Sequence, residues 1–168
     1  MKKLIFFILL PISLSAQTEI LIGNGSVSPE KHPFYGLYDY SQNMYIYKSN
    51  ELGDDHAEIY ELYFDLFGYS EGYEYNNLII KMAHISNDYF PSNTTAELDH
   101  LSYTDLTTVV NSYDLIIDQN EWIRIPFDNM FTYNGSDNLL IIIENHDGTW
   151  SPGFGAATCF YDNEYNSW

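Results

Sequence analysis

The chain is built largely from segments in which apolar and polar residues alternate with a period of two. In residues 60–66 the even-numbered positions are apolar, whereas the odd-numbered positions are Glu61, Tyr63 and Asp65. Residues 78–83 and 121–127 alternate in the same way, with Trp122 and Arg124 on the polar face of the second segment. Because successive side chains of a strand point to opposite faces, all three segments are predicted as strands with one buried face.

Residues 139–143 break this alternation with five consecutive aliphatic side chains. Such a run is typical of a central strand that is covered on both faces. Weaker strand patterns occupy residues 44–48, 113–117 and 158–161, and residues 49–53 predict one helical turn, capped by Ser49 and ended by Gly53. The inward positions of the strongest strands predict a core of Leu62, Phe64, Ile80, Met82, Ile125, Phe127, Leu139 and Ile141.

Turn-forming residues separate these segments. Clusters of Gly, Asn, Asp and Ser occur at 23–25, 68–72, 76–77, 134–138 and 147–148. Short strands divided by turns, with almost no helix, predict an all-β fold. We therefore expect one antiparallel β-sandwich domain, jelly-roll-like in its architecture.

The amino-terminal residues have the pattern of a Sec-type signal peptide. Lys2 and Lys3 precede an apolar run at 4–12, and small residues follow at 13–16. The run is interrupted by Pro11 and is too short to cross a hydrocarbon core of ~30 Å. The pattern predicts a signal peptide over 1–16 and a β-sandwich domain over 17–168, secreted or at the cell surface and not inserted in a membrane after cleavage. Amino-terminal sequencing of secreted protein should then begin at or near Gln17.

Composition narrows the classes of partner. The chain has 24 acidic residues against 6 Lys and Arg, a balance that excludes nucleic acid because phosphates need facing cations. The acidity indicates either a solvated surface or affinity for divalent cations or basic partners.

The 16 Tyr, 10 Phe and 3 Trp exclude a disordered chain. Cys159 is the single cysteine, so the domain depends on its core and not on internal disulfides.

A set of short motifs also occurs in a recognisable order. These are IGNG (22–25), PFYG (33–36), SNELG (49–53), IKMAHIS (80–86), LTTV (106–109), Trp122, PF (126–127) and YNGSDNLLI (133–141). In this order the chain resembles a jelly-roll-like β-sandwich module of bacterial secreted and cell-surface multidomain proteins, which is often associated with type IX secretion. The resemblance implies a module that lies beside catalytic or adhesive domains, and it carries no catalytic residues over to this chain. Two alternatives stand: a small complete protein, or a fragment of a longer one.

Motifs for catalysis are not visible in the sequence. The five histidines are scattered, and neither an HExxH helix nor a G-x-S-x-G nucleophile elbow occurs. We therefore expect a protein without enzymatic activity and assign no catalytic residue. Oxygen-rich loops at Asp54, Asp55 and Asp147 suggest a structural calcium ion, and solvated turns are the competing interpretation.

The carboxy-terminal aromatic residues are the candidate ligand-binding groups. Trp150, Phe154 and Trp168 lie near glycines, and exposed aromatic rings stack on the faces of sugars. The alternative is that these rings close the ends of the sandwich. The sequence thus predicts an exported, non-catalytic module for adhesion, glycan binding or scaffolding at the cell surface, with glycans or other surface proteins as partners. The alternative is an accessory domain or fragment of a secreted protease or glycosidase whose catalytic part lies elsewhere.

Overall fold

The computed structural model describes residues 19–22, 33–35, 40–53, 55–67, 72–90, 103, 105–117, 122–148 and 156–159, without the side chains of 66–67 and 156–159. The predicted signal peptide lies outside these ranges. The elements are β1 (Phe34–Tyr35), β2 (Ser41–Tyr47), α1 (Ser49–Leu52), β3 (Ala57–Phe67), β4 (Tyr73–Ile85), β5 (Thr107–Ile117), β6 (Trp122–Tyr133), β7 (Asn138–Asn145) and β8 (Ala156–Cys159). Within the described part of the chain, no helix is long and apolar enough to cross a membrane.

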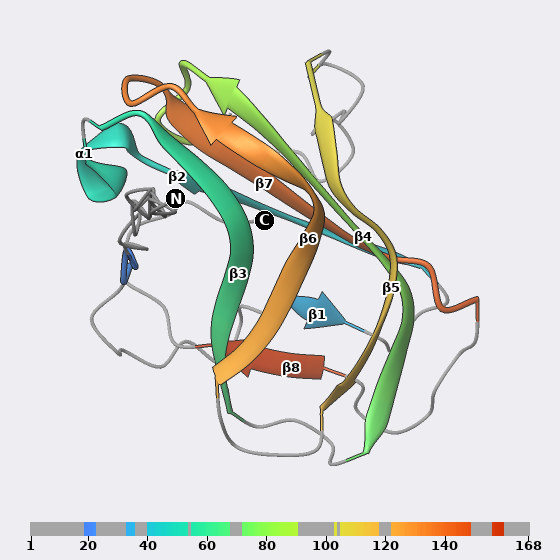
Figure 1. Cartoon of the computed structure of the whole chain (residues 1–168). Helices are drawn as coiled ribbons and strands as arrows, with labels where there is room; N and C mark the ends of the chain where they lie inside the picture. Colours follow the sequence, from blue (N-terminus) through green and yellow to red (C-terminus); the bar gives the residue numbers. More distant parts are fainter. Residues whose placement is uncertain are drawn as a thin grey trace, which may run out of the picture.

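The strands form two antiparallel sheets that pack against each other, as the sequence predicted (Figure 1). One sheet has the order β1-β8-β3-β6, and the other has the order β2-β7-β4-β5. Strand 1 pairs with strand 8, strand 2 with 7, strand 3 with 6 and strand 4 with 5. This pairing is that of a long hairpin rolled up on itself, which is the jelly-roll arrangement of an eight-stranded sandwich.

The main core lies between the two sheets. It contains inward side chains of both sheets, and Leu78, Ile80, Met82, Ile125 and Ile143 are all essentially inaccessible to solvent. Six of the eight predicted core residues are buried, whereas Leu62 and Phe127 are partly buried and pack against the cluster. The alternating pattern therefore assigned the inward faces of these strands correctly.

A second, smaller core covers the outer face of the β2-β7-β4 sheet. Met44, Ile46, Ile85, Leu140 and Ile142 form its floor, and three residues of the β4–β5 connection pack on that floor, namely Phe90, Tyr103 and Leu106. Strand β7 lies between β2 and β4, and each of its residues from Asn138 to Ile143 is buried. The prediction of a central strand covered on both faces is confirmed.

Two expectations about strand positions were wrong because of β-bulges. Asn76 and Asn77, predicted as a turn, lie inside β4, where Asn77 has a positive φ of 58° and Asp114 accepts its backbone N–H at 2.9 Å. Tyr60, predicted to point inward, is 52% exposed because β3 shifts its register against β6 between Ile59 and Glu61. A bulge moves side chains to the other face, and a single strand's pattern does not show it.

The helical turn α1 ends at Gly53 as predicted, since Gly53 has a φ of 86° that glycine adopts without strain. Its amino-terminal cap is Lys48 and not Ser49: the carboxylate of Glu51 accepts the Lys48 backbone N–H at 2.8 Å. The backbone N–H of Ser49 instead donates to Asn138 at the start of β7, at 2.9 Å. The turn is thereby tied to the end of the sandwich where β7 begins.

Candidate functional site

The residues predicted as ligand-binding lie outside the part of the chain that the structure describes. Trp150, Phe154 and Trp168 belong to this group, and so does Asp54 of the predicted calcium site. Their predicted roles stay predictions.

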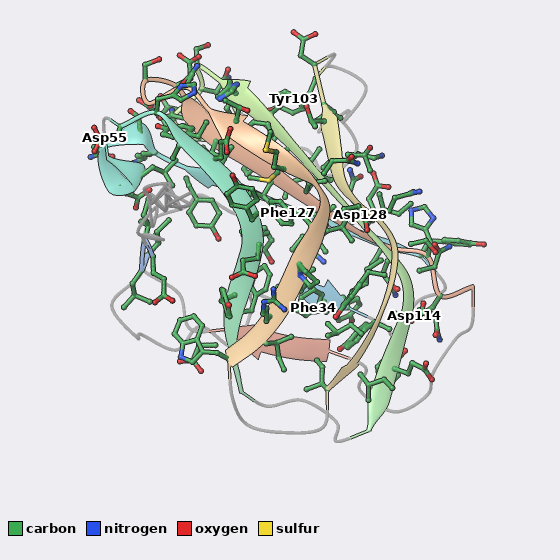
Figure 2. All side chains as sticks on the ribbon, viewed as in Figure 1. Phe34, Asp55, Tyr103, Asp114, Phe127 and Asp128 are labelled. Carbon is green, nitrogen blue, oxygen red and sulfur yellow. The ribbon has the colours of Figure 1, made fainter. Side chains whose placement is uncertain are left out.

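The other two predicted calcium ligands lie at opposite ends of β7. Asp55 is exposed and follows α1, near the start of β7 (Figure 2). Asp147 follows the end of β7, where its carboxylate accepts hydrogen bonds from the backbone N–H of Asn76, from the Tyr73 hydroxyl at 3.3 Å and from the Asn145 side chain at 3.1 Å. Asp55 and Asp147 therefore belong to separate loops, and Asp147 anchors the bulge of β4.

Exposed aromatic side chains gather instead on the outer face of β3 and β6. Trp122 is 49% exposed and Tyr63 is 42% exposed, although both belong to strands of the sandwich. Arg124 lies on the same face, with 58% of its side chain exposed. Glu61 and Asp65 complete this face on β3. We call these five residues, Glu61, Tyr63, Asp65, Trp122 and Arg124, the β3–β6 platform.

The register between the two strands places the platform residues together. Tyr63 pairs with Arg124, and Asp65 pairs with Trp122. Paired side chains on one face of an antiparallel sheet have Cβ atoms roughly 4.5–5.5 Å apart, and diagonal neighbours such as Tyr63 and Trp122 are roughly 7–8 Å apart. The inward neighbours Phe64, Ile123 and Ile125 are buried in the main core, which holds the outward side chains on a firm sheet.

Glu61 links the polar groups of the platform. Its two carboxylate oxygens accept separate hydrogen bonds, one from the Tyr63 hydroxyl at 2.8 Å and one from Nε of Arg124 at 2.6 Å. These bonds leave only 14% of the Glu61 side chain exposed, so the expectation that it faces solvent freely was wrong. The hydrogen bond to Glu61 raises the pKa of the Tyr63 hydroxyl, and it also raises the pKa of Arg124. Tyr63 is thus a neutral phenol and Arg124 a cation whose charge is compensated.

A second polar cluster lies on the outer face of the other sheet. Glu144 of β7 accepts a hydrogen bond from Lys81 of β4 at 2.7 Å and contacts Nε2 of His146 at 3.1 Å. The His146 ring in turn meets the ring of Tyr40 edge-on, with 5.8 Å between centroids. Burial raises the pKa of Glu144, but its bonds and charge interactions with Lys81 and His146 outweigh burial, and the net shift is downward. We read this cluster as a stabilising ion-pair network.

His84 has a structural role at the rim of the core. Its Nε2 accepts the backbone N–H of Asn134 at 3.1 Å, and its ring lies beside those of Phe131 and Tyr133. It therefore holds the β6–β7 turn at the rim of the core.

The platform combines aromatic surfaces with hydrogen-bonding groups. Two aromatic rings offer faces for stacking, and Arg124 and Asp65 offer a donor and an acceptor. Among the described residues, no three side chains of His, Cys, Asp or Glu come together as metal ligands.

Comparison with protein-family models, curated proteins and solved structures finds no match. The resemblance to a bacterial surface module therefore stays a prediction.

Sequence reasoning placed Tyr63, Trp122 and Arg124 on outward faces but did not select them as a site. The signal was present, because two large aromatic residues at solvent-facing strand positions contradict the polar composition expected there. What the sequence does not contain is the β3–β6 pairing, which brings residues about 60 positions apart onto one surface.

Proposed function

We propose that this chain is an exported, non-catalytic β-sandwich module that binds glycan through the β3–β6 platform. One observation carries the proposal: Tyr63 and Trp122 are diagonal neighbours on a sheet face and both are nearly half exposed. Release of the water around such rings is favourable in free energy when another flat apolar surface covers them. The less polar face of a sugar ring is such a surface.

The polar groups of the platform support this function as well. A stacked sugar presents hydroxyl groups at its rim, and these need partners when water is displaced. Arg124 has five N–H donors, of which Nε is engaged by Glu61, and Asp65 has a carboxylate that accepts hydrogen bonds. A shallow platform covers only part of its ligand, so the affinity should be weak for a single contact and should suit multivalent adhesion at a surface.

A glycan array probed with the purified protein tests the proposal. The wild type should be retained on a subset of glycans, and Trp122→Thr should lose this retention, because it removes the stacking face but keeps a residue that favours strands. The free energy of unfolding should change by less than about 1 kcal/mol, since the ring is half exposed.

Tyr89→Ala is the matched control. Tyr89 is 66% exposed but lies after β4 and belongs to neither β3 nor β6. Retention should survive this change. Equal loss in both variants, or no retention of any glycan by the wild type, would contradict glycan binding and favour a scaffolding role. Turnover of a glycan or peptide substrate by the purified chain would contradict the non-catalytic assignment.

A further inference from the structure

We infer that the ligand of the β3–β6 platform is an oligosaccharide without anionic groups, at least two units long, which lies across β3 and β6. This inference rests on the proposed glycan binding and adds the charge class, the minimum length and the direction of the ligand. It follows from the pairing of charges on the platform and from the separation of its two rings.

The charges of the platform disfavour anionic glycans. Arg124 is the one cation among its five residues, and its Nε lies 2.6 Å from Oε2 of Glu61. With Asp65 included, the platform carries two carboxylates against one guanidinium. The chain as a whole has a net charge of −18, so an anionic polysaccharide is repelled at long range as well.

The same charges do not repel a cationic glycan, but Glu61 is not the group that would hold one. Both carboxylate oxygens of Glu61 already accept hydrogen bonds, from Tyr63 and from Arg124. Its side chain is 86% covered, which follows from an exposed fraction of 14%. An ammonium group would have to displace Arg124 to reach this carboxylate. Hydroxyl groups, which donate and accept, can use Arg124 and Asp65 as they stand.

The spacing of the two rings determines the minimum length of the ligand and the direction in which it lies. Tyr63 and Trp122 belong to neighbouring strands and are diagonal to each other, with Cβ atoms about 7–8 Å apart. Both side chains are nearly half exposed, so with this separation we expect the two rings to contact successive units of a chain and not one monosaccharide. The line between the rings crosses from β3 to β6, and the bound chain therefore runs across these strands.

Titration calorimetry on the intact protein tests the inference. The neutral probes are glucose, mannose and xylose and the tetrasaccharides of glucan, mannan and xylan. Galacturonate and glucosamine tetramers are the charged probes. A neutral tetrasaccharide should bind at least about tenfold more tightly than its monosaccharide. This affinity should be the same at about 0.01 M and about 0.15 M salt, because no charges meet at the interface.

Variants test the contributions of the two rings and of the Glu61–Arg124 pair to binding separately. Tyr63→Ala and Trp122→Thr should each reduce the gain from monosaccharide to tetrasaccharide, whereas Tyr89→Ala should preserve it. Glu61→Gln removes the charge that compensates Arg124 and should strengthen binding of the galacturonate tetramer relative to the wild type. Circular dichroism and thermal melting of each variant would show that the sandwich still forms.

The outcomes distinguish this inference from the proposed function. Binding of the galacturonate tetramer that depends on Trp122 and weakens with salt would overturn the inference and leave glycan binding intact. Equal affinities for a monosaccharide and its tetramer would overturn the two-unit ligand. An unchanged affinity of Glu61→Gln for galacturonate would refute the role of Glu61 in charge selection. Absence of binding to every probe would refute the inference and the proposed function together.

Discussion

At the scale of single residues, the outward positions of this fold differ in what they do although they look alike in the sequence. Glu61 and Glu144 both occupy polar positions of strands, and each is largely covered because it lies between partners. The alternation of the sequence predicts that the carboxylate of Glu61 points away from the main core. It cannot predict the coverage of either carboxylate, because the partners, Arg124 for Glu61 and Lys81 for Glu144, come from neighbouring strands.

The interactions of Glu144 lead to a prediction about how the stability of the fold depends on pH. Its pKa is lowered from the ordinary value of 4.5 in the folded protein, as Lys81 and His146 outweigh the opposite effect of burial. A carboxyl with a lowered folded-state pKa stabilises the fold above its unfolded pKa and loses this contribution as the pH falls through the folded value. The wild type should therefore lose stability relative to Glu144→Gln as the pH is lowered below 4.5.

Urea denaturation of both proteins above and below that pH measures this difference. Glu74→Gln is the control, since Glu74 is an exposed glutamate on β4, the strand that carries Lys81. A constant gap between the wild type and Glu144→Gln across the acidic range would show that the network does not stabilise the folded state.

At the scale of elements, a strand could be predicted where its own residues show the period of two or show that both of its faces must be buried. The five aliphatic residues at 139–143 required cover on both sides, and β7 has it. The identity of the outer cover was not predictable, because Phe90, Tyr103 and Leu106 belong to a connection without periodicity. The bulges at Asn76–Asn77 and beside Tyr60 were missed for a related reason, since a bulge is a property of two paired strands.

The double covering of β7 predicts equal sensitivity on its two faces. Ile141 is buried in the main core and Ile142 in the outer one, with 3% and 0% of their surfaces exposed. Substitution of either by Ala should lower the free energy of unfolding by about 2–5 kcal/mol, because apolar burial is lost and a cavity remains. Ile116→Ala is the control: this side chain is 54% exposed, so the change should stay within about 1 kcal/mol.

Chemical denaturation of the three variants supplies the test. If Ile142→Ala behaved like Ile116→Ala, the outer cluster formed with Phe90, Tyr103 and Leu106 would not contribute to stability. The strand would then be covered on one face alone in solution.

At the scale of the whole molecule, the sequence predicted the class of fold but did not point to the β3–β6 platform. Alternation, turns and the scarcity of helix were sufficient for a β-sandwich, since these features determine which side chains can be buried together. The platform depends on long-range pairing, in which the third strand meets the sixth. The aromatic residues near the carboxy terminus were predicted as a site from their glycine-rich surroundings. These surroundings are a local feature that carries no information about which strands pair.

The net charge makes the last prediction. Cleavage of the predicted signal peptide would remove Lys2 and Lys3, and the 24 acidic residues against 4 Lys and Arg would then give 24 − 4 = 20 excess negative charges. The described ion pairs of Lys81 and Arg124 each compensate one carboxylate, so most of this charge repels itself in the compact state. Salt shortens the Debye length from about 30 Å at 0.01 M to about 8 Å at 0.15 M and should relieve that repulsion.

The melting temperature should accordingly rise between these two NaCl concentrations by at least ~2 °C, the shift that ~1 kcal/mol produces in a domain of this size. KCl should act like NaCl at equal ionic strength, because screening does not depend on the identity of the monovalent cation. An excess effect of CaCl₂ over MgCl₂ at matched ionic strength would instead reveal a specific calcium site, for which the loop of Asp54 and Asp55 and the separate loop of Asp147 are the candidates. A melting temperature that falls with NaCl would mean that attractive pairs outweigh the net repulsion, against the charge balance of the chain.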